Sequence, residues 1–247
     1  MSKSTSWGKV ANWYDSMLEN PDSYQNTLIL PNLLRLLELK KGESVLDLAC
    51  GQGFFANEFA KLGTRITGVD ISPELINIAK KGIGEYHVAS ADKLDYLKDN
   101  SFDKAVIILS LQNIGNVNGV ISEANRVLKP KGKLFLVLNH PAFRIPKKSS
   151  WGWDESLKTQ YRRLETYLSE SKEPIQMHPG AKPWEKTISF HRPLQFYFKA
   201  LSKNNLFVSR LEEWSSNRES EPGPKKFAED QARHEFPLFL FLEAIKS

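Results

Sequence analysis

Two glycines and an aspartate in the first third of the chain form a pattern that suits an adenosine-containing ligand. Gly51 and Gly53 follow the apolar run Ser44–Ala49 and precede a stretch with helical spacing. Glycine permits a tight turn and a close approach of a ligand to the backbone, and the first N–H groups of a helix are free to bind it. Asp70 ends the next apolar run, where a carboxylate can accept hydrogen bonds from ribose hydroxyls. These residues predict an adenosine site at the carboxyl edge of a parallel sheet.

The residue ahead of the glycines bears on which cofactor is bound. Gly51, Gly53 and Ala56 satisfy the dinucleotide pattern G-x-G-x-x-A, and Asp70 follows at the distance found in NAD-binding folds. Asp47, however, would lie near the pyrophosphate of NAD, and like charges repel. Its carboxylate suits a ligand with a cationic end, such as the ammonium of a methionine moiety. The alternative is that Asp47 only caps the loop by accepting hydrogen bonds from backbone amides.

Histidines and aromatic residues of the second half are candidates for catalysis and substrate binding. His140 and His191 are candidate general bases, since imidazole titrates near neutral pH. The candidate substrate residues are Trp151, Trp153, Arg162 and His178. Each has a structural alternative, in which the histidines stabilise loops and the tryptophans form a small apolar core.

Short apolar runs alternate with helical patterns up to Leu138. Strands are expected at 44–49, 65–69, 85–88, 104–109 and 133–138, and helices at 53–62, from Ser72 onward and at 117–128. Further on, a helix is expected at 193–203, apolar segments at 206–211 and 238–245, and a loop at 215–233. Such alternation indicates βαβ units and a parallel sheet covered on both faces.

The segment 141–192 interrupts this rhythm with several prolines, three tryptophans and many charges. It is longer than an ordinary connection, and long insertions on a rigid scaffold are often lids or binding loops. We expect one domain over residues 1–247, with residues 141–192 forming a cap over the substrate site and a helix at 155–168 inside that cap.

Composition limits the partners and the compartment. The net charge of +5 comes from scattered basic pairs with acidic residues between them, which is typical of a solvated surface and by itself decides nothing about partners. The sequence has no appended RNA-binding module and no dense basic stripe, so we do not expect a nucleic-acid partner. The lone cysteine, Cys50, fits a reducing compartment, and no apolar window reaches the roughly 20 residues of a membrane span. These two observations predict a cytoplasmic protein. No cluster of His, Cys and carboxylate residues has metal-site spacing, so we expect no metal.

Five segments in order resemble the motifs of the class I S-adenosylmethionine-dependent methyltransferases, and of these the ubiquinone- and menaquinone-biosynthesis-like enzymes that act on small molecules. The segments are 45–53 (VLDLACGQG), 68–72 (GVDIS), 89–93 (ASADK), 101–113 (SFDKAV followed by SLQN) and 123–134 (EANRVLKPKGKL). The resemblance covers about half of the chain. It departs from the family at Lys131, where a glycine is usual, and we expect that turn to tolerate the lysine.

The resemblance implies a fold and a set of cofactor-binding residues. The fold would be a doubly wound, mostly parallel seven-stranded sheet with an antiparallel last strand and an insertion after strand five. The implied cofactor residues are Tyr14, Asp47, Ala49, Gly51, Gly53, Asp70, Ile71, Ala91, Asp92, Lys93 and Ser110. Asp70 would hold the ribose and Asp92 the adenine amino group, while the segment around Tyr14 would close over the cofactor.

The function that follows from the resemblance is methyl transfer from S-adenosylmethionine to a small-molecule acceptor. Three alternatives stay open: an RNA methyltransferase, an NAD-linked oxidoreductase, and a cofactor-binding protein without catalysis. The acceptor, the atom that receives the methyl group and the oligomeric state do not follow from the sequence.

Overall fold

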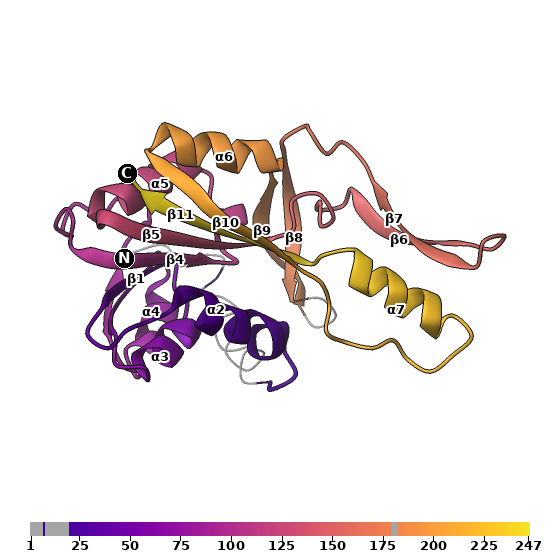
Figure 1. The fold of residues 1–247 in the computed structure, drawn as a ribbon, viewed down its shortest axis with the longest axis horizontal. Coiled ribbons are helices and arrows are strands. Elements are labelled where there is room, and N and C mark those ends of the chain that lie inside the picture. The colour runs from indigo at the N-terminus through magenta and orange to yellow at the C-terminus, as the bar shows by residue number, and fades with distance from the viewer. Residues whose placement is uncertain (1–6, 8–19, 179–181) are drawn as a thin grey trace.

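The computed structural model describes Trp7, residues 20–178 and residues 182–247, and Tyr14 therefore lies outside the described residues. The main sheet has seven strands in the order β10-β11-β5-β4-β1-β2-β3 (Figure 1). Its strands are β1 (Ser44–Leu48), β2 (Arg65–Asp70), β3 (Glu85–Val88), β4 (Phe102–Ile108), β5 (Leu128–Asn139), β10 (Leu206–Trp214) and β11 (Phe239–Lys246). The last strand, β11, runs antiparallel to both of its neighbours, β10 and β5. The expected sheet, with its antiparallel last strand, is confirmed.

Helices cover both faces of the sheet, because the central strands are apolar on both sides. In β1, Val45 faces one core while Leu46 and Leu48 face the other. The first core contains residues of α2 (Leu30–Leu37), α3 (Phe54–Ala60) and α4 (Pro73–Ala79). The second contains residues of α5 (Val117–Val127) and α6 (Leu194–Lys203). Two-sided burial of a continuous apolar strand is what a parallel sheet requires, and it fixes the carboxyl ends of β1 and β4 side by side.

Short helical turns complete the connections at the two ends of the sheet. The π-helix η2 (Gln25–Ile29) leads into α2, and the 3-10 helix η3 (Leu111–Asn113) follows β4. Ser72 accepts a hydrogen bond from the Leu75 N–H at 3.4 Å, and Pro73 follows it, so α4 begins as the sequence predicts.

The segment 141–192 folds as two hairpins. The first pairs β6 (Ser149–Asp154) with β7 (Thr159–Leu164), and the second pairs β8 (Ser171–His178) with β9 (Lys182–His191). The helix predicted at 155–168 is therefore wrong. Asp154 Oδ1 accepts hydrogen bonds from the N–H groups of Ser156 and Leu157, both at 2.9 Å, and this local turn competes with a helix.

The loop predicted at 215–233 is also wrong in its last third. The structure has a helix there, α7 (Lys226–Glu235), which begins two residues after Pro224. Pro222-Gly223-Pro224 correctly marks an irregular connection, but the following residues include alanines, glutamates and a glutamine that favour a helix. Figure 1 shows α7 beside the β6–β7 hairpin, and together they project away from the sheet.

Lys131 occupies the position where the resembling family has glycine, and its backbone is left-handed, with a φ of 64°. A Cβ is disfavoured there by about 1–2 kcal/mol. We predict that Lys131→Gly raises the free energy of unfolding, by up to about 1 kcal/mol after the greater flexibility of glycine in the unfolded chain is subtracted. Urea unfolding at equilibrium measures this change.

Lys131→Ala is the matched control, because it removes the charge and keeps the Cβ. We expect it to leave the stability near that of the unmodified protein. Equal stabilisation by both substitutions would show that the lysine charge, and not the backbone, is responsible.

Candidate functional site

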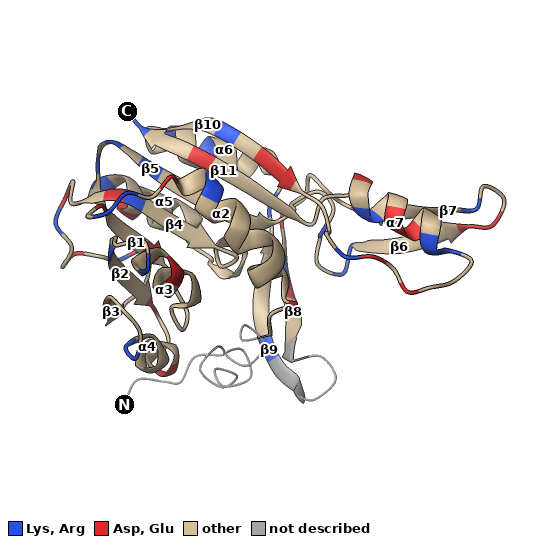
Figure 2. Cartoon of the chain, turned by 60° about the horizontal axis from the view of Figure 1, so that its bottom comes forward, with Lys and Arg blue, Asp and Glu red and all other residues tan. Residues whose placement is uncertain are grey.

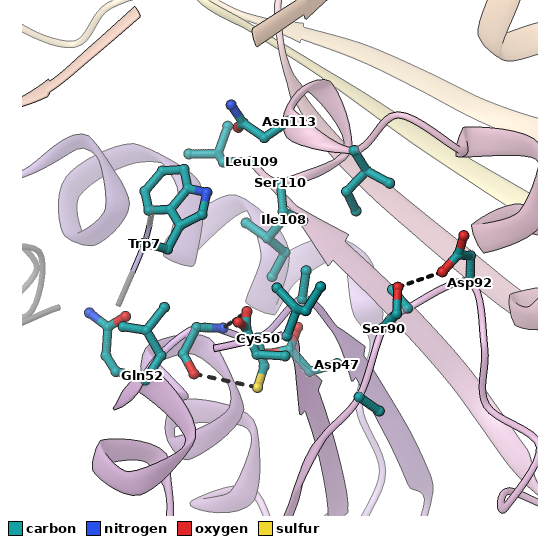
Figure 3. Close-up of a pocket in the computed structure, with 18 of the residues that line it drawn as sticks. Trp7, Asp47, Cys50, Gln52, Ser90, Asp92, Ile108, Leu109, Ser110 and Asn113 are labelled. Atoms are coloured by element: carbon teal, nitrogen blue, oxygen red, sulfur yellow. Dashed lines mark hydrogen bonds between the residues drawn. The ribbon is translucent and has the colours of Figure 1, made fainter. Parts of the chain in front are cut away.

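A cavity of about 350 Å³ lies at the carboxyl ends of β1, β2 and β4. This size falls within the usual range for small-molecule sites. Its lining comprises Trp7, Asp47, Ala49, Cys50, Gly51, Gln52, Phe54, Phe55, Asp70, Ile71, Leu75, Ala89, Ser90, Ala91, Asp92, Ile108, Leu109, Ser110, Asn113, Ile114, Gly115 and Asn116. Figure 3 shows Asp47 and Cys50 in one part of this cavity, Ser90 and Asp92 at one side, and Trp7 across from them.

Asp47 is a buried carboxylate without a cationic partner. Its residue is 2% exposed, and no lysine or arginine of the described chain lies within 4.0 Å of it. Burial, reinforced by the nearby charge of Asp70, raises the pKa of Asp47 to about 7. The loop-capping alternative does not hold for the described residues, because the Gly51 N–H donates to Asp70 instead. Within the described part of the chain, the Asp47 carboxyl therefore has no cationic side chain to stabilise its ionised form.

Asp70 closes the turn between the first two strands and also faces the cavity. Its Oδ2 accepts a hydrogen bond from the Gly51 N–H at 3.0 Å, and its Oδ1 accepts one from the Ser72 N–H at 2.8 Å. Burial raises the pKa of Asp70, while these backbone donors oppose the shift. The Ile71 backbone is a third donor, and together these bonds hold the carboxylate in place at the wall of the cavity.

The two glycines of the loop have different roles. Gly51 has a φ of 57° and lines the cavity, and a Cβ added to it would meet nothing within 4 Å, so its side of the loop is open to a ligand. Gly53 has a φ of 79° and does not line the cavity. A Cβ at Gly53 would meet Tyr86 Oη at 3.1 Å and Ala79 Cβ at 3.2 Å, so this glycine serves the packing of α3.

The opposite side of the cavity carries Asp92. Ser90 Oγ donates to its Oδ1 at 2.5 Å and Asn116 Nδ2 donates to its Oδ2 at 2.8 Å. These donors, more than any other cause, lower the pKa of Asp92, which keeps the carboxylate ionised. Ala91 and the exposed Ile71 provide apolar surface beside it. Lys93, in contrast, is not part of the lining.

Ser110 lies at the end of β4 and lines the same cavity. Its buried hydroxyl has no hydrogen-bond partner within the described part of the chain. Leu109 beside it has a left-handed backbone, with a φ of 53°, and so does Ala49 on the neighbouring strand end, with a φ of 57°. Such strain in residues other than glycine is concentrated at functional sites.

His140 is not brought to the cavity. Its Nδ1 accepts from the N–H groups of Ala142 and Phe143, at 3.2 and 3.4 Å, which leaves Nε2 to donate to Glu213 Oε1 at 2.7 Å. Burial lowers the pKa of His140, and Glu213 opposes that shift. With both nitrogens engaged, this histidine holds the loop after β5 in place.

His191 is also absent from the lining of the cavity. It is buried, and its Nε2 lies 2.7 Å from the carbonyl oxygen of Tyr167. His178 belongs to β8, and its side chain lies outside the described part of the structure. Neither candidate base from the sequence therefore faces the cavity formed by Asp47 and Asp70.

The substrate candidates separate into two locations. Trp151 and Arg162 share a second cavity, with the Arg162 guanidinium carbon 4.9 Å from the centre of a Trp151 ring. Trp153 lies next to α7 instead, where Lys225 Nζ is 4.4 Å from the centre of its ring. Neither tryptophan lines the cavity that contains Asp47.

Several lining residues have no counterpart in the sequence-based assignment. They are Trp7, Cys50, Gln52, Phe54, Phe55, Leu75, Ala89, Ser90, Ile108, Leu109, Asn113, Ile114, Gly115 and Asn116. The position of Asn116 carries a local signal, since its side chain accepts from the Gly119 N–H at 3.1 Å and so caps α5 at the sheet edge. Trp7 carries none, because it approaches the site through tertiary structure alone.

Comparison with known proteins gives a family and a fold. Residues 46–136 match the family model described as a methyltransferase domain. The chain is 34% identical over 113 residues to the demethylmenaquinone methyltransferase of Tropheryma whipplei, a match that covers 43% of this chain and 46% of that protein. It is 33% identical over 136 residues to the ubiquinone biosynthesis O-methyltransferase of Xanthomonas oryzae, which covers 50% and 54%. The chain thus spans about half the length of these relatives.

A solved structure extends the likeness in fold to nearly the whole chain. The S-adenosylmethionine-dependent methyltransferase of Mesorhizobium loti superposes with a TM-score of 0.71 at 23% identity, covering 93% of this chain and 100% of that one. At this identity the likeness concerns the fold. Residues 46–136 thus match a methyltransferase domain, and the strand order and fold of the chain are similar to those of S-adenosylmethionine-dependent methyltransferases.

Proposed function

We propose that the protein transfers the methyl group of S-adenosylmethionine to a small-molecule acceptor. The observation that carries this proposal is the buried carboxylate of Asp47, which has no cationic partner among the described residues. A buried carboxylate without a cation is unfavourable, and a ligand with cationic groups offsets that cost. S-adenosylmethionine carries an ammonium and a sulfonium, whereas NAD would bring its negatively charged pyrophosphate to this loop.

The residues around the cavity fit this cofactor. Asp70, held at the cavity wall by its backbone donors, would accept a hydrogen bond from the ribose hydroxyls. Asp92 would accept from the adenine amino group, with Ile71 and Ala91 against the ring. Asp47 would lie near the cationic end, and the open side of Gly51 would allow the ligand to approach the backbone.

The bound cofactor supplies an activated methyl group, so the chain has to position the acceptor and exclude water. We propose that the unpartnered Ser110 hydroxyl serves as a polar contact for ligands on the β4 side. The described lining contains no histidine. We therefore propose that His140 and His191 support loops. Methyl transfer would then depend on how the cavity positions the two reactants.

The acceptor site is proposed to include the second hairpin of segment 141–192. Asn113 Nδ2 donates to the Ile188 carbonyl at 2.9 Å, and Arg192 Nη2 donates to the carbonyls of Ile114 and Gly115 at 2.9 and 3.0 Å. The hairpin β8–β9 is thereby fastened to the wall of the cavity. This attachment supports the hypothesis that the segment caps the substrate site.

A small-molecule acceptor agrees with the names of the relatives, which refer to demethylmenaquinone and to ubiquinone biosynthesis. Figure 2 shows lysines and arginines interspersed with acidic residues along the chain, a distribution that favours this acceptor class over RNA. No helix among the described residues is long and apolar enough to cross a membrane. We propose a cytoplasmic location, which the single cysteine supports.

The proposal predicts that the protein binds S-adenosylmethionine and S-adenosylhomocysteine, and that NAD does not bind. Both adenosine ligands with an ammonium satisfy Asp47, and the pyrophosphate of NAD does not. Isothermal calorimetry with the three ligands measures this. Binding of NAD without binding of either methionine-derived ligand would contradict the proposal.

The second prediction concerns the two outer carboxylates. Asp70→Asn should weaken S-adenosylhomocysteine binding about ten- to hundredfold, because a charge-assisted hydrogen bond contributes about 1.5–3 kcal/mol. Asparagine keeps one acceptor oxygen for the loop amides, so the turn is preserved better than by alanine. Asp92→Ala should weaken binding less, since adenine also gains apolar contact. Calorimetry measures both affinities.

Asp95→Ala is the control for these substitutions, because Asp95 is exposed and outside the cavity. It should bind S-adenosylhomocysteine like the unmodified protein. If Asp70→Asn is folded and retains the full affinity, Asp70 is not the ribose ligand.

The third prediction is a pH dependence set by Asp47. Because its pKa in the free protein is about 7, the affinity for S-adenosylhomocysteine should fall as the pH falls through this value. The pKa of Asp47 is higher in the folded than in the unfolded protein. The protonated carboxyl therefore contributes stability to the free protein at low pH, and this contribution is lost as the pH rises through about 7. Asp47→Asn should therefore abolish this pH dependence of binding and stabilise the free protein above pH 7. Calorimetry and thermal unfolding over a pH series measure the two effects.

The assignment of Asp47 fails if the affinity of Asp47→Asn for S-adenosylhomocysteine keeps the same pH dependence as that of the unmodified protein.

A further inference from the structure

A second cavity, of about 180 Å³, lies at the same edge of the sheet, beyond the end of β5 and the beginning of β11. Its lining comprises Tyr24, Phe143, Arg144, Trp151, Arg162, Phe236, Pro237 and Leu238. These residues come from the N-terminal region, the loop after β5, the β6–β7 hairpin and the segment before β11. None of them lines the cavity that contains Asp47.

Two guanidinium groups face this cavity without carboxylate partners. Arg144 Nη1 donates to Asn139 Oδ1 at 2.6 Å, and Arg162 donates from Nε to the Phe143 carbonyl and from Nη2 to Ser149 Oγ, both at 2.9 Å. Within the described part of the chain, neither forms an ion pair. Desolvation lowers the pKa of both guanidinium groups, and the charge of Arg162 lowers that of Arg144 further. The two positive charges thus lie close together. Both guanidinium groups have N–H donors left over, and no described carboxylate neutralises them.

The walls of the cavity are aromatic. Phe236 contacts Phe143 and Trp151 edge-on, with ring centres 5.5 Å apart in each pair. The Arg162 guanidinium lies over Trp151 at 4.9 Å. A cavity of about 150 Å³ with apolar walls is known to hold benzene, so 180 Å³ accommodates one ring with a small substituent.

We propose that this cavity binds the anionic end of an aromatic acid, with the acid group between Arg144 and Arg162 and the ring against Phe143, Trp151 and Phe236. Guanidinium groups bind carboxylates through paired, charge-assisted hydrogen bonds, and the aromatic walls provide apolar surface for the ring. Since both cavities open at one edge of the sheet, this site selects a methyl acceptor that carries such a group. That last step rests on the proposed function, whereas the ligand site itself does not.

Sodium benzoate is a suitable probe, and calorimetry on the full chain measures its affinity. We expect benzoate to bind, and both benzamide, which lacks the charge, and acetate, which lacks the ring, to bind more weakly. Arg144→Gln should weaken benzoate binding about tenfold or more. Its guanidinium donates only to Asn139, so this variant should fold. Arg162→Gln should have a similar effect. If Arg162→Gln does not fold, Arg162→Lys replaces it, because lysine keeps the positive charge.

Arg163→Gln is the matched control, because Arg163 lies on the same strand and is paired with Glu165 at the surface. It should leave the benzoate affinity unchanged. Benzoate should also bind with the same affinity when the protein is saturated with S-adenosylhomocysteine, and all variants should keep their affinity for that ligand. Failure to bind S-adenosylhomocysteine would refute the proposed function and leave the benzoate result intact.

Three results would overturn the aromatic-acid site. They are absence of benzoate binding, equal weakening by Arg144→Gln and Arg163→Gln, and competition between benzoate and S-adenosylhomocysteine for one site. A crystal soaked with 4-bromobenzoate supplies an independent check through the anomalous signal of bromine. We expect that signal among Phe143, Trp151 and Phe236, and a signal only elsewhere would contradict the proposal.

Discussion

The constraint on which the site depends is the placement of one carboxylate in a buried position where no other described residue supplies a cation. Asp47 is near the end of β1, which pairs with β2 on one side and β4 on the other. A strand inside a sheet cannot turn its carboxylate to solvent without breaking two ladders of hydrogen bonds. The chain therefore retains a group whose ionisation is unfavourable in the free protein, and the raised pKa of about 7 records this. A cationic ligand makes the ionised form favourable.

The surrounding backbone is shaped to leave this carboxylate accessible. Ala49 and Leu109 adopt left-handed conformations at the ends of neighbouring strands, and Gly51 adopts another in the turn between them and α3. Backbone strain of this kind persists only where the surroundings enforce it. Here the two cores enforce it, because fully buried residues of β1 and β4 hold both strand ends in register. Packing of the central strands thus compensates for the unfavourable left-handed backbone of Ala49 and Leu109 at the sheet edge.

The sequence predicts what local periodicity and short motifs determine. The alternation along β1, β4 and β5 comes from packing on two faces, and Asp47, Asp70 and Asp92 meet because the carboxyl ends of parallel strands share one edge. Predictions failed where tertiary contacts decide. Gly53 matches a nucleotide motif, yet a side chain at this position would meet Tyr86 and Ala79. His140 follows β5 directly, but Glu213, distant in sequence, binds its imidazole.

Segment 141–192 was the least predictable part, because hairpins packed against a helix near the other end of the chain leave little periodic signal. The pairing of β6 with β7 and the contact of that hairpin with α7 are long-range features.

The most direct test of the account is a measurement of the Asp47 carboxyl pKa by carbon NMR, in the free protein and in its complex with S-adenosylhomocysteine. The account predicts a pKa near 7 without ligand and a clear decrease when the ammonium of the ligand is bound. A pKa that stays the same in the saturated complex would contradict the claim that Asp47 exists to receive a cationic ligand.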